Sequence, residues 1–178
     1  MRLLIVYASK EGHTAKIARR IFDVAGETPN VEVTLAEVGE VLPNALTNCN
    51  AVIIAASVHF DRHPRAIVRF VRDNLAWLRA HRSAFLSVSG ASMTPAGRQQ
   101  AEDYVTDFLD ETRWSPDRYE LVAGAMPFTK YGLLIRFIIK RIAKAKGLST
   151  DTKRDHEYTD WAALDRFART FVARAVAA

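Results

Sequence analysis

The sequence predicts an α/β protein with a doubly wound, five-stranded parallel sheet in the order 2-1-3-4-5. Three observations predict this fold. Short apolar runs alternate along the chain with segments whose apolar residues recur every three or four positions. Several of the runs are apolar throughout, which is typical of strands covered by helices on both faces. The 178 residues, 49% hydrophobic and 25% charged, suit one domain over 1–178 with a substantial core.

Five short segments have the composition of β-strands. The first and third are apolar throughout, whereas the second alternates apolar and polar residues, as a strand at the edge of a sheet does. Each is bounded by polar or glycine-containing segments that favour turns. The predicted strands are residues 3–8, 31–35, 51–55, 84–88 and 121–124.

The segments that follow the strands carry their apolar residues at helical spacing. The predicted helices lie within 14–25, 67–78, 104–109 and 161–172, and Asp160 is the expected N-cap of the last one. Right-handed crossovers between such units make the strands parallel. Ligands of this fold class bind at the carboxyl ends of the strands, near the point where the strand order reverses.

Several classes of protein are excluded by composition and by the N-terminal sequence. The one cysteine, Cys49, leaves no internal disulfide, and no pair of histidines or cysteines has metal-ligand spacing. The first ten residues lack a cleavage site, and no apolar stretch approaches the ~20 residues that span a bilayer. We therefore expect an intracellular domain without a bound metal.

The positive charge of the chain is concentrated in one segment. The net charge is +5, from 25 basic and 20 acidic residues, and the segment between Glu120 and Asp151 has no acidic residue. Its basic residues are Lys130, Arg136, Lys140, Arg141, Lys144 and Lys146. A local patch of one sign indicates an anionic partner.

The turn after the first strand has the composition of a phosphate-binding loop. A helix N-terminus offers unpaired N–H groups and a partial positive charge, hydroxyl side chains add donors, and glycine lets the backbone close around an anion. Neither a Walker loop nor a G-x-G-x-x-G fingerprint is present, so the loop suits a phosphomonoester. The alternative is that its hydroxyls only cap the helix. Its residues are Ser9, Lys10, Glu11, Gly12, His13 and Thr14.

This loop resembles the first loop of the flavodoxin family, which follows a (T/S)-x-T-G-x-T pattern and binds the phosphate of FMN. Ser9, Gly12 and Thr14 match the pattern, and Glu11 replaces a threonine. A carboxylate facing inward would repel a phosphate. We therefore expect Glu11 to point to solvent and to offer only its backbone N–H.

A narrower resemblance covers nearly the whole chain. The first loop, together with segments 56–60, 114–118 and 158–161, is similar to the FMN-dependent, quinone-linked protoporphyrinogen oxidases of bacterial haem biosynthesis. The stretch from 122 through the basic segment to 153 also fits, whereas residues 89–97 carry no charge where members have a basic loop. The resemblance implies oxidation of protoporphyrinogen IX to protoporphyrin IX by FMN, with menaquinone or ubiquinone as acceptor.

The same resemblance places the flavin ring over the loops after the third and fourth strands. Phe60 is expected to stack on an aromatic ring, and His59 to hydrogen-bond or pair with a reduced flavin. The alternatives are that Phe60 fills the core and that His59 is an exposed loop residue. No side chain is an evident general base, and His59 and Asp61 are candidates by position only. His63 and His81 are expected at the surface. The predicted ring contacts are Ser57, Val58, His59, Phe60, Ser87, Val88, Ser89 and Gly90.

The basic segment is predicted to form an amphipathic helix from Tyr131 to Lys146, within an insertion over about 126–157. Its cationic face suits an interfacial helix on the cytoplasmic face of the bacterial inner membrane, or contact with a carboxylate-bearing porphyrin. An ordinary helix packed on the domain is the alternative, and nucleic acid is disfavoured. The expected contacts are Arg136, Phe137, Lys140, Arg141 and Lys144.

Two other functions stay open on the sequence. One is a flavodoxin-type FMN electron carrier or an FMN-dependent quinone reductase, although carriers usually present an acidic surface. The other is a flavin-free signalling or scaffold domain on the same fold. The oligomeric state is not specified by the sequence.

Overall fold

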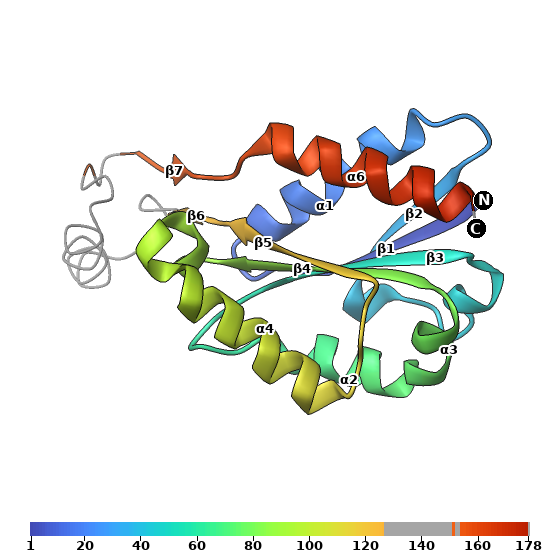
Figure 1. Ribbon diagram of the computed structural model, residues 1–178, viewed down its shortest axis with the longest axis horizontal. Helices are drawn as coiled ribbons and strands as arrows, with labels where there is room; N and C mark the ends of the chain where they lie inside the picture. The colour runs from blue at the N-terminus through green and yellow to red at the C-terminus, as the bar shows by residue number, and fades with distance from the viewer. Residues whose placement is uncertain (127–150, 152–153, 178) are drawn as a thin grey trace.

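The computed structural model describes residues 1–126, 151 and 154–177, and contains the predicted sheet (Figure 1). Five parallel strands run in the order β2-β1-β3-β4-β5, which confirms the predicted topology. The strand ends lie within three residues of the predicted ones: β5 begins three residues earlier and ends one residue earlier than predicted, and β2 begins one residue later. The strands are β1 (Arg2–Ala8), β2 (Glu32–Glu37), β3 (Ala51–Ser57), β4 (Arg82–Ser89) and β5 (Arg118–Ala123).

The helices follow the predicted order, with one difference. The segment predicted as one helix over 67–78 forms two helices separated by Asn74, whose side-chain amide donates to the Phe70 carbonyl over 2.8 Å. An asparagine that bonds the preceding turn in this way ends a helix. The α-helices are α1 (His13–Gly26), α2 (Arg65–Asp73), α3 (Leu75–Ala80), α4 (Arg98–Thr112) and α6 (Trp161–Val176), and the 3-10 helices are η1 (Val38–Glu40), η2 (Ala45–Asn48), η3 (Ala91–Met93) and η4 (Pro95–Gly97).

The sheet separates two apolar layers (Figure 1). On one face, Ile5 and Ile53 pack with α1 and α6; on the other, Leu4 and Ile54 pack with α2, α3 and α4. Neighbouring residues of one strand therefore enter opposite layers, as the pleat of a strand requires. Burial on both faces explains why β1 and β3 are almost continuously apolar.

A second, two-stranded sheet lies beyond the end of β5. In it β6 (Ala125–Met126) pairs antiparallel with β7 (His156–Glu157), and Ala125 lies opposite Glu157. No sequence pattern predicted this sheet, since two-residue strands leave no periodicity. The predicted helix over 131–146, with Arg136, Phe137, Lys140, Arg141 and Lys144, lies outside the described residues.

The last helix begins as predicted. The Asp160 carboxylate accepts a hydrogen bond from the Ala163 N–H at 2.9 Å, and this satisfies one of the free donors of the first turn of α6. Among the helices of the described residues, none is both long enough and apolar enough to cross a bilayer.

The turn between η3 and α4 depends on close backbone contact at Gly97. A Cβ at this position would lie 2.2 Å from the Ala91 carbonyl oxygen, which belongs to backbone and cannot swing away. We expect Gly97→Ala to lower the free energy of unfolding by about 1–3 kcal/mol through overpacking. Urea denaturation measures this. Gly26→Ala is the matched control, because a Cβ at that position would meet nothing within 4 Å, and it is expected to be neutral or stabilising.

Candidate functional site

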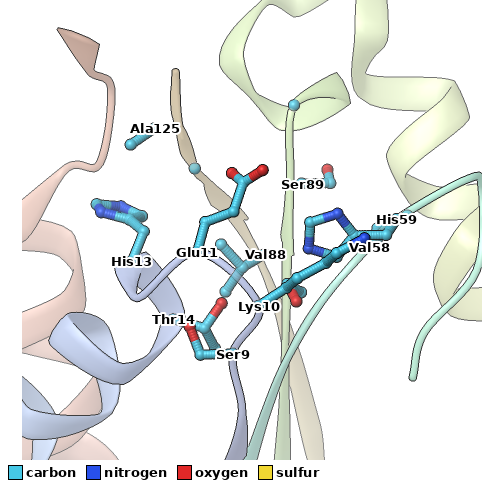
Figure 2. Close-up of a pocket in the computed structure, with 13 residues that line it drawn as sticks. Ser9, Lys10, Glu11, His13, Thr14, Val58, His59, Val88, Ser89 and Ala125 are labelled. Carbon is cyan, nitrogen blue, oxygen red and sulfur yellow. The ribbon is translucent and has the colours of Figure 1, made fainter. Parts of the chain in front are cut away.

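One pocket opens at the carboxyl ends of β1, β3 and β4, where the fold class places its ligands (Figure 2). The loops after these strands form its walls, and the start of β6 closes one side. The lining residues are Ser9, Lys10, Glu11, His13, Thr14, Ser57, Val58, His59, Val88, Ser89, Gly90, Gly124 and Ala125.

The predicted binding residues therefore come together, with three exceptions. Gly12, Phe60 and Ser87 do not line the pocket, whereas Gly124 and Ala125 line it without having been predicted. These two residues follow β5, and the Gly124 N–H donates to the carbonyl of Ser89, the last residue of β4, over 3.1 Å. The rule that carboxyl ends of parallel strands share an edge would have included them, had it been applied to the fifth strand as well.

The first loop leaves the N-terminus of α1 open. Gly12 precedes the helix at a φ of 95°, a left-handed conformation that favours glycine, and its N–H donates to the Ser9 hydroxyl over 3.0 Å. No side chain of the described residues caps α1, so the alternative in which Ser9 and Thr14 only cap the helix is not observed. The amides of the first turn consequently keep the free donors and partial charge that attract an anion, next to a pocket that His13 and Thr14 line.

Two side chains of this loop have different surroundings. Thr14 is buried, with 2% of its surface exposed, and lines the base of the pocket. Glu11 is half-buried and also lines the pocket, so the expectation that it turns away to solvent is wrong. Figure 2 shows its side chain rising from the loop between His13 and His59. An anion bound at the amides therefore shares the pocket with a carboxylate.

A buried hydroxyl in the pocket wall has no partner. The Oγ of Ser57, at the end of β3, forms no hydrogen bond with any described residue, although Ser57 is only 9% exposed. Leaving such a group unpaired costs about 1–3 kcal/mol. Ser89, on the opposite wall, is different, because its hydroxyl already contacts the Ser92 hydroxyl at 2.8 Å. The Ser57 hydroxyl is thus a polar group in the pocket wall whose hydrogen-bonding capacity the described residues leave unmet.

His59 stands at the rim of the pocket as a neutral base. Burial lowers the pKa of its imidazole; the Glu11 carboxylate partly opposes this, and the Lys10 ammonium reinforces it. A neutral imidazole has one donor and one acceptor nitrogen. His59 can therefore hydrogen-bond polar groups of a ligand without carrying a fixed charge.

His63 is not a surface residue, which corrects the prediction. Its ring is 7% exposed and packs between Phe85 and Phe108, with centroids at 5.1 and 4.9 Å. Its Nε2 lies 3.0 Å from the Oγ of Ser87, a fully buried residue, so this hydroxyl is engaged beneath the pocket. No local sequence pattern indicates that the loop after β3 folds back and buries this histidine in the core. His81, in contrast, is exposed as predicted.

His13 ties the first loop to the second sheet. The Thr159 hydroxyl donates to the Ala123 carbonyl at 2.7 Å, so its oxygen accepts from Nε2–H of His13, also at 2.7 Å. This assigns the Nε2–H tautomer. Burial lowers the pKa of His13, and the Glu157 carboxylate, 3.7 Å from Nδ1, partly offsets that effect. The neutral ring thereby bridges the start of α1 and the segment that returns into α6.

Comparisons with known proteins agree with this fold. The model of the flavodoxin domain family matches residues 4–153. Protoporphyrinogen IX dehydrogenase (quinone) of Escherichia coli is 32% identical over 170 residues, which cover 95% of this chain and 93% of that protein. A protein of the same name from Leishmania major is 29% identical over 173 residues, which cover 97% of this chain and 75% of the other.

Solved structures resemble the chain in fold. A flavodoxin from the domain Archaea has a TM-score of 0.59 at 14% identity, with 99% of both chains covered. Oxidised Flavodoxin 1 from Bacillus cereus has a TM-score of 0.57 at 16% identity, with 97% of this chain and 98% of that one covered.

The buried His63 predicts a pH dependence of stability. Burial lowers its pKa from 6.5 to about 4, so the unfolded chain binds the proton more tightly than the folded one. The stabilising effect of the neutral ring is present above pH 6.5 and is lost as the pH falls toward 4, on the order of 3 kcal/mol in all. Urea unfolding over this pH range measures it.

The variant His63→Gln removes the titrating ring and keeps an amide that can bond Ser87. Its free energy of unfolding should fall less between pH 6.5 and 4 than that of the wild type, whatever its absolute stability. His81→Gln is the control at an exposed histidine. Equal pH slopes for His63→Gln and the wild type would contradict the assignment.

Proposed function

The chain belongs to the flavodoxin domain family, and from this premise we propose that its pocket binds FMN and that it oxidises protoporphyrinogen IX to protoporphyrin IX with a quinone as acceptor. The unpaired hydroxyl of Ser57 is the observation that carries the cofactor assignment, because a buried donor without a protein partner fits a bound ligand. The reaction is inferred from the relatives' name and from their identity over nearly the whole chain.

The residues present fit a flavin mononucleotide. The open amides of α1, with Gly12 at positive φ and the buried Thr14, would hold the phosphate. Ser57 and His59 would hydrogen-bond polar groups of the cofactor from the loop after β3. The half-buried Glu11 would sit beside it and disfavour additional negative charge.

When bound, FMN supplies the acceptance and release of hydride or electrons. The protein contributes binding, orientation and electrostatics. The imidazole of His59 can accept a proton at its unprotonated nitrogen, because burial holds its pKa below the usual value and keeps the ring neutral near pH 7. No side chain of the described residues is thereby assigned as an obligatory base.

Purified protein tests the reaction. With bound FMN, protoporphyrinogen IX and a menaquinone or ubiquinone analogue under anaerobic conditions, porphyrin fluorescence should rise with time. Protein that binds FMN, but gives no fluorescence above the uncatalysed rate, would instead fit an electron carrier. Protein that takes up no FMN would contradict the cofactor assignment itself.

Ser57 gives a sharper prediction, with opposite effects on stability and binding. Ser57→Ala removes an unpaired hydroxyl, so the cofactor-free protein should be as stable as the wild type or more stable by about 1 kcal/mol. The dissociation constant of FMN should rise by about five- to tenfold, for one lost hydrogen bond. Fluorescence titration measures it.

Ser83→Ala is the matched control, because this buried serine lies near the start of β4, at the end of the strand away from the pocket. Its affinity for FMN should equal that of the wild type. An unchanged FMN affinity in Ser57→Ala would remove Ser57 from the binding site.

We also propose that the basic segment brings the enzyme to an anionic membrane surface, where quinones reside. The support is the run of six basic residues without an acidic one between Glu120 and Asp151. Its flanks are held close to the pocket, because β6 pairs with β7 and Ala125 lines the pocket wall.

Neutralising Arg136, Lys140 and Lys144 to glutamine should weaken binding to vesicles that contain phosphatidylglycerol. At about 1 kcal/mol per basic residue, three substitutions lower the partition coefficient about 100-fold. Cosedimentation measures it. The control carries Arg65, Arg69 and Arg174 changed to glutamine, which removes the same charge from exposed sites on α2 and α6. If both variants lost vesicle binding equally, the effect would come from net charge and not from the basic segment.

A further inference from the structure

A strained turn at the rim of the pocket presents an aromatic ring to solvent. His59 and Arg62 exchange backbone hydrogen bonds of 2.9 and 3.2 Å, which closes a two-residue turn over Phe60 and Asp61. Both central residues have positive φ, 50° and 60°, as a type I′ turn requires. Such turns normally use asparagine or glycine, and a bulky residue there is an outlier.

The surroundings hold this turn in place. The Tyr104 hydroxyl of α4 donates to the Asp61 carboxylate, so the second strained residue is fixed to a helix. Burial and this contact both raise the pKa of Tyr104, which keeps the hydroxyl protonated as a donor. Strain of this kind persists only where other contacts impose it, and it concentrates at binding and catalytic sites.

The Phe60 ring itself is left in water. It is 93% exposed and does not line the pocket, whereas its neighbour His59 does. The Phe60 ring is therefore accessible to a ligand at the rim of this pocket. A ring that is both costly to expose and held by a strained turn is suited to contact a ligand that arrives after the cofactor is bound.

A cation accompanies this ring. The Lys10 ammonium, from the first loop, lies 5.6 Å from the Phe60 ring centroid, and Lys10 also lines the pocket. No carboxylate of the described residues forms an ion pair with Lys10. The loop after β3 therefore places an apolar ring at the rim, and the loop after β1 places a cation beside it. Among the described residues, this cation has no carboxylate partner.

We propose that the Lys10–Phe60 pair is the receiving site for the substrate, with Phe60 against its apolar ring system and Lys10 paired with one of its carboxylates. This inference rests on the proposed function, since it assigns contacts to a carboxylate-bearing tetrapyrrole. The cation and the aromatic face together match a ligand that is apolar over a broad face and anionic at its edge. A quinone offers no carboxylate and would use Phe60 alone.

Direct binding tests this pair without requiring turnover. Protoporphyrin IX, the fluorescent product, is titrated into FMN-loaded protein, and FMN affinity and the KM for protoporphyrinogen IX are measured in parallel. Lys10→Gln and Phe60→Leu should each weaken porphyrin binding and raise KM by about five- to tenfold, as one ion pair or one ring contact is lost. Phe60→Leu, at a residue that does not line the pocket, should leave kcat and FMN affinity within about twofold, a bound that separates binding from transition-state effects.

Conservative variants separate the two contributions. Lys10→Arg and Phe60→Trp should retain porphyrin affinity. The wild-type affinity should fall with added salt, and Lys10→Gln should lose most of that dependence. Phe60→Gly relaxes the strained turn, so its urea midpoint should rise while its porphyrin affinity falls. Arg19→Gln is the matched control, because its guanidinium lies 5.0 Å from the Phe22 ring on α1, away from the pocket, and it should change nothing.

The outcomes distinguish the two claims. If Lys10→Gln and Phe60→Leu bind porphyrin like the wild type while FMN binding and turnover are intact, the Lys10–Phe60 pair is refuted and the proposed function stands. If Phe60→Leu weakens FMN instead, the ring contacts the cofactor and the inference is overturned. If the wild type binds no porphyrin and shows no turnover, the proposed function fails, and the inference fails with it.

Discussion

The open N-terminus of α1 is the constraint on which the candidate site depends. Gly12 adopts a left-handed conformation, and this lets the chain turn from β1 into the helix while the Ser9 hydroxyl takes the Gly12 N–H. The next amides have no intrahelical acceptor and no side-chain cap among the described residues. A parallel sheet makes this geometry unavoidable at its switch point, because helices begin where strands end. The residues of the loops after β3 and β4 then determine which anionic ligand binds at the N-terminus of α1.

Two hydrogen-bonded connections keep the walls of the pocket in register with that helix. The Val58 N–H donates to the Val88 carbonyl over 2.8 Å, which extends the pairing of β3 and β4 into the loops. On the other side, the chain His13–Thr159–Ala123 joins α1 to the returning segment and to the end of β5. The first loop and the flanks of the basic segment thus share one set of bonds. A displacement of the segment between β7 and α6, which contains Thr159, would therefore also move the N-terminus of α1.

Much of this arrangement could be predicted, because it follows from periodicity and from the carboxyl-edge rule. Continuous apolar runs identified β1 and β3, and their order placed the first loop beside the loops after β3 and β4. The predictions that were wrong concerned residues whose positions depend on single tertiary contacts. His63 was expected at the surface, but the loop folds it between Phe85 and Phe108, and it occupies the Ser87 hydroxyl that was predicted to face the ligand. The break at Asn74 arises from one side-chain amide, which helical spacing does not register.

The charges around the pocket differ from those of a plain phosphate site, and the difference bears on what can bind. Glu11 is retained in the wall although a carboxylate weakens anion binding, while Lys10 next to it is directed toward the Phe60 ring. The loop thereby places one charge of each sign in the pocket wall, and the positive one also lies 5.6 Å from the Phe60 ring centroid. Burial keeps His59, whose pKa both charges influence, neutral near pH 7. If the Lys10–Phe60 pair receives the substrate as proposed, a substrate carboxylate meets a cation at Lys10 and a like charge at Glu11, which would direct its apolar part, rather than its carboxylate, into the pocket.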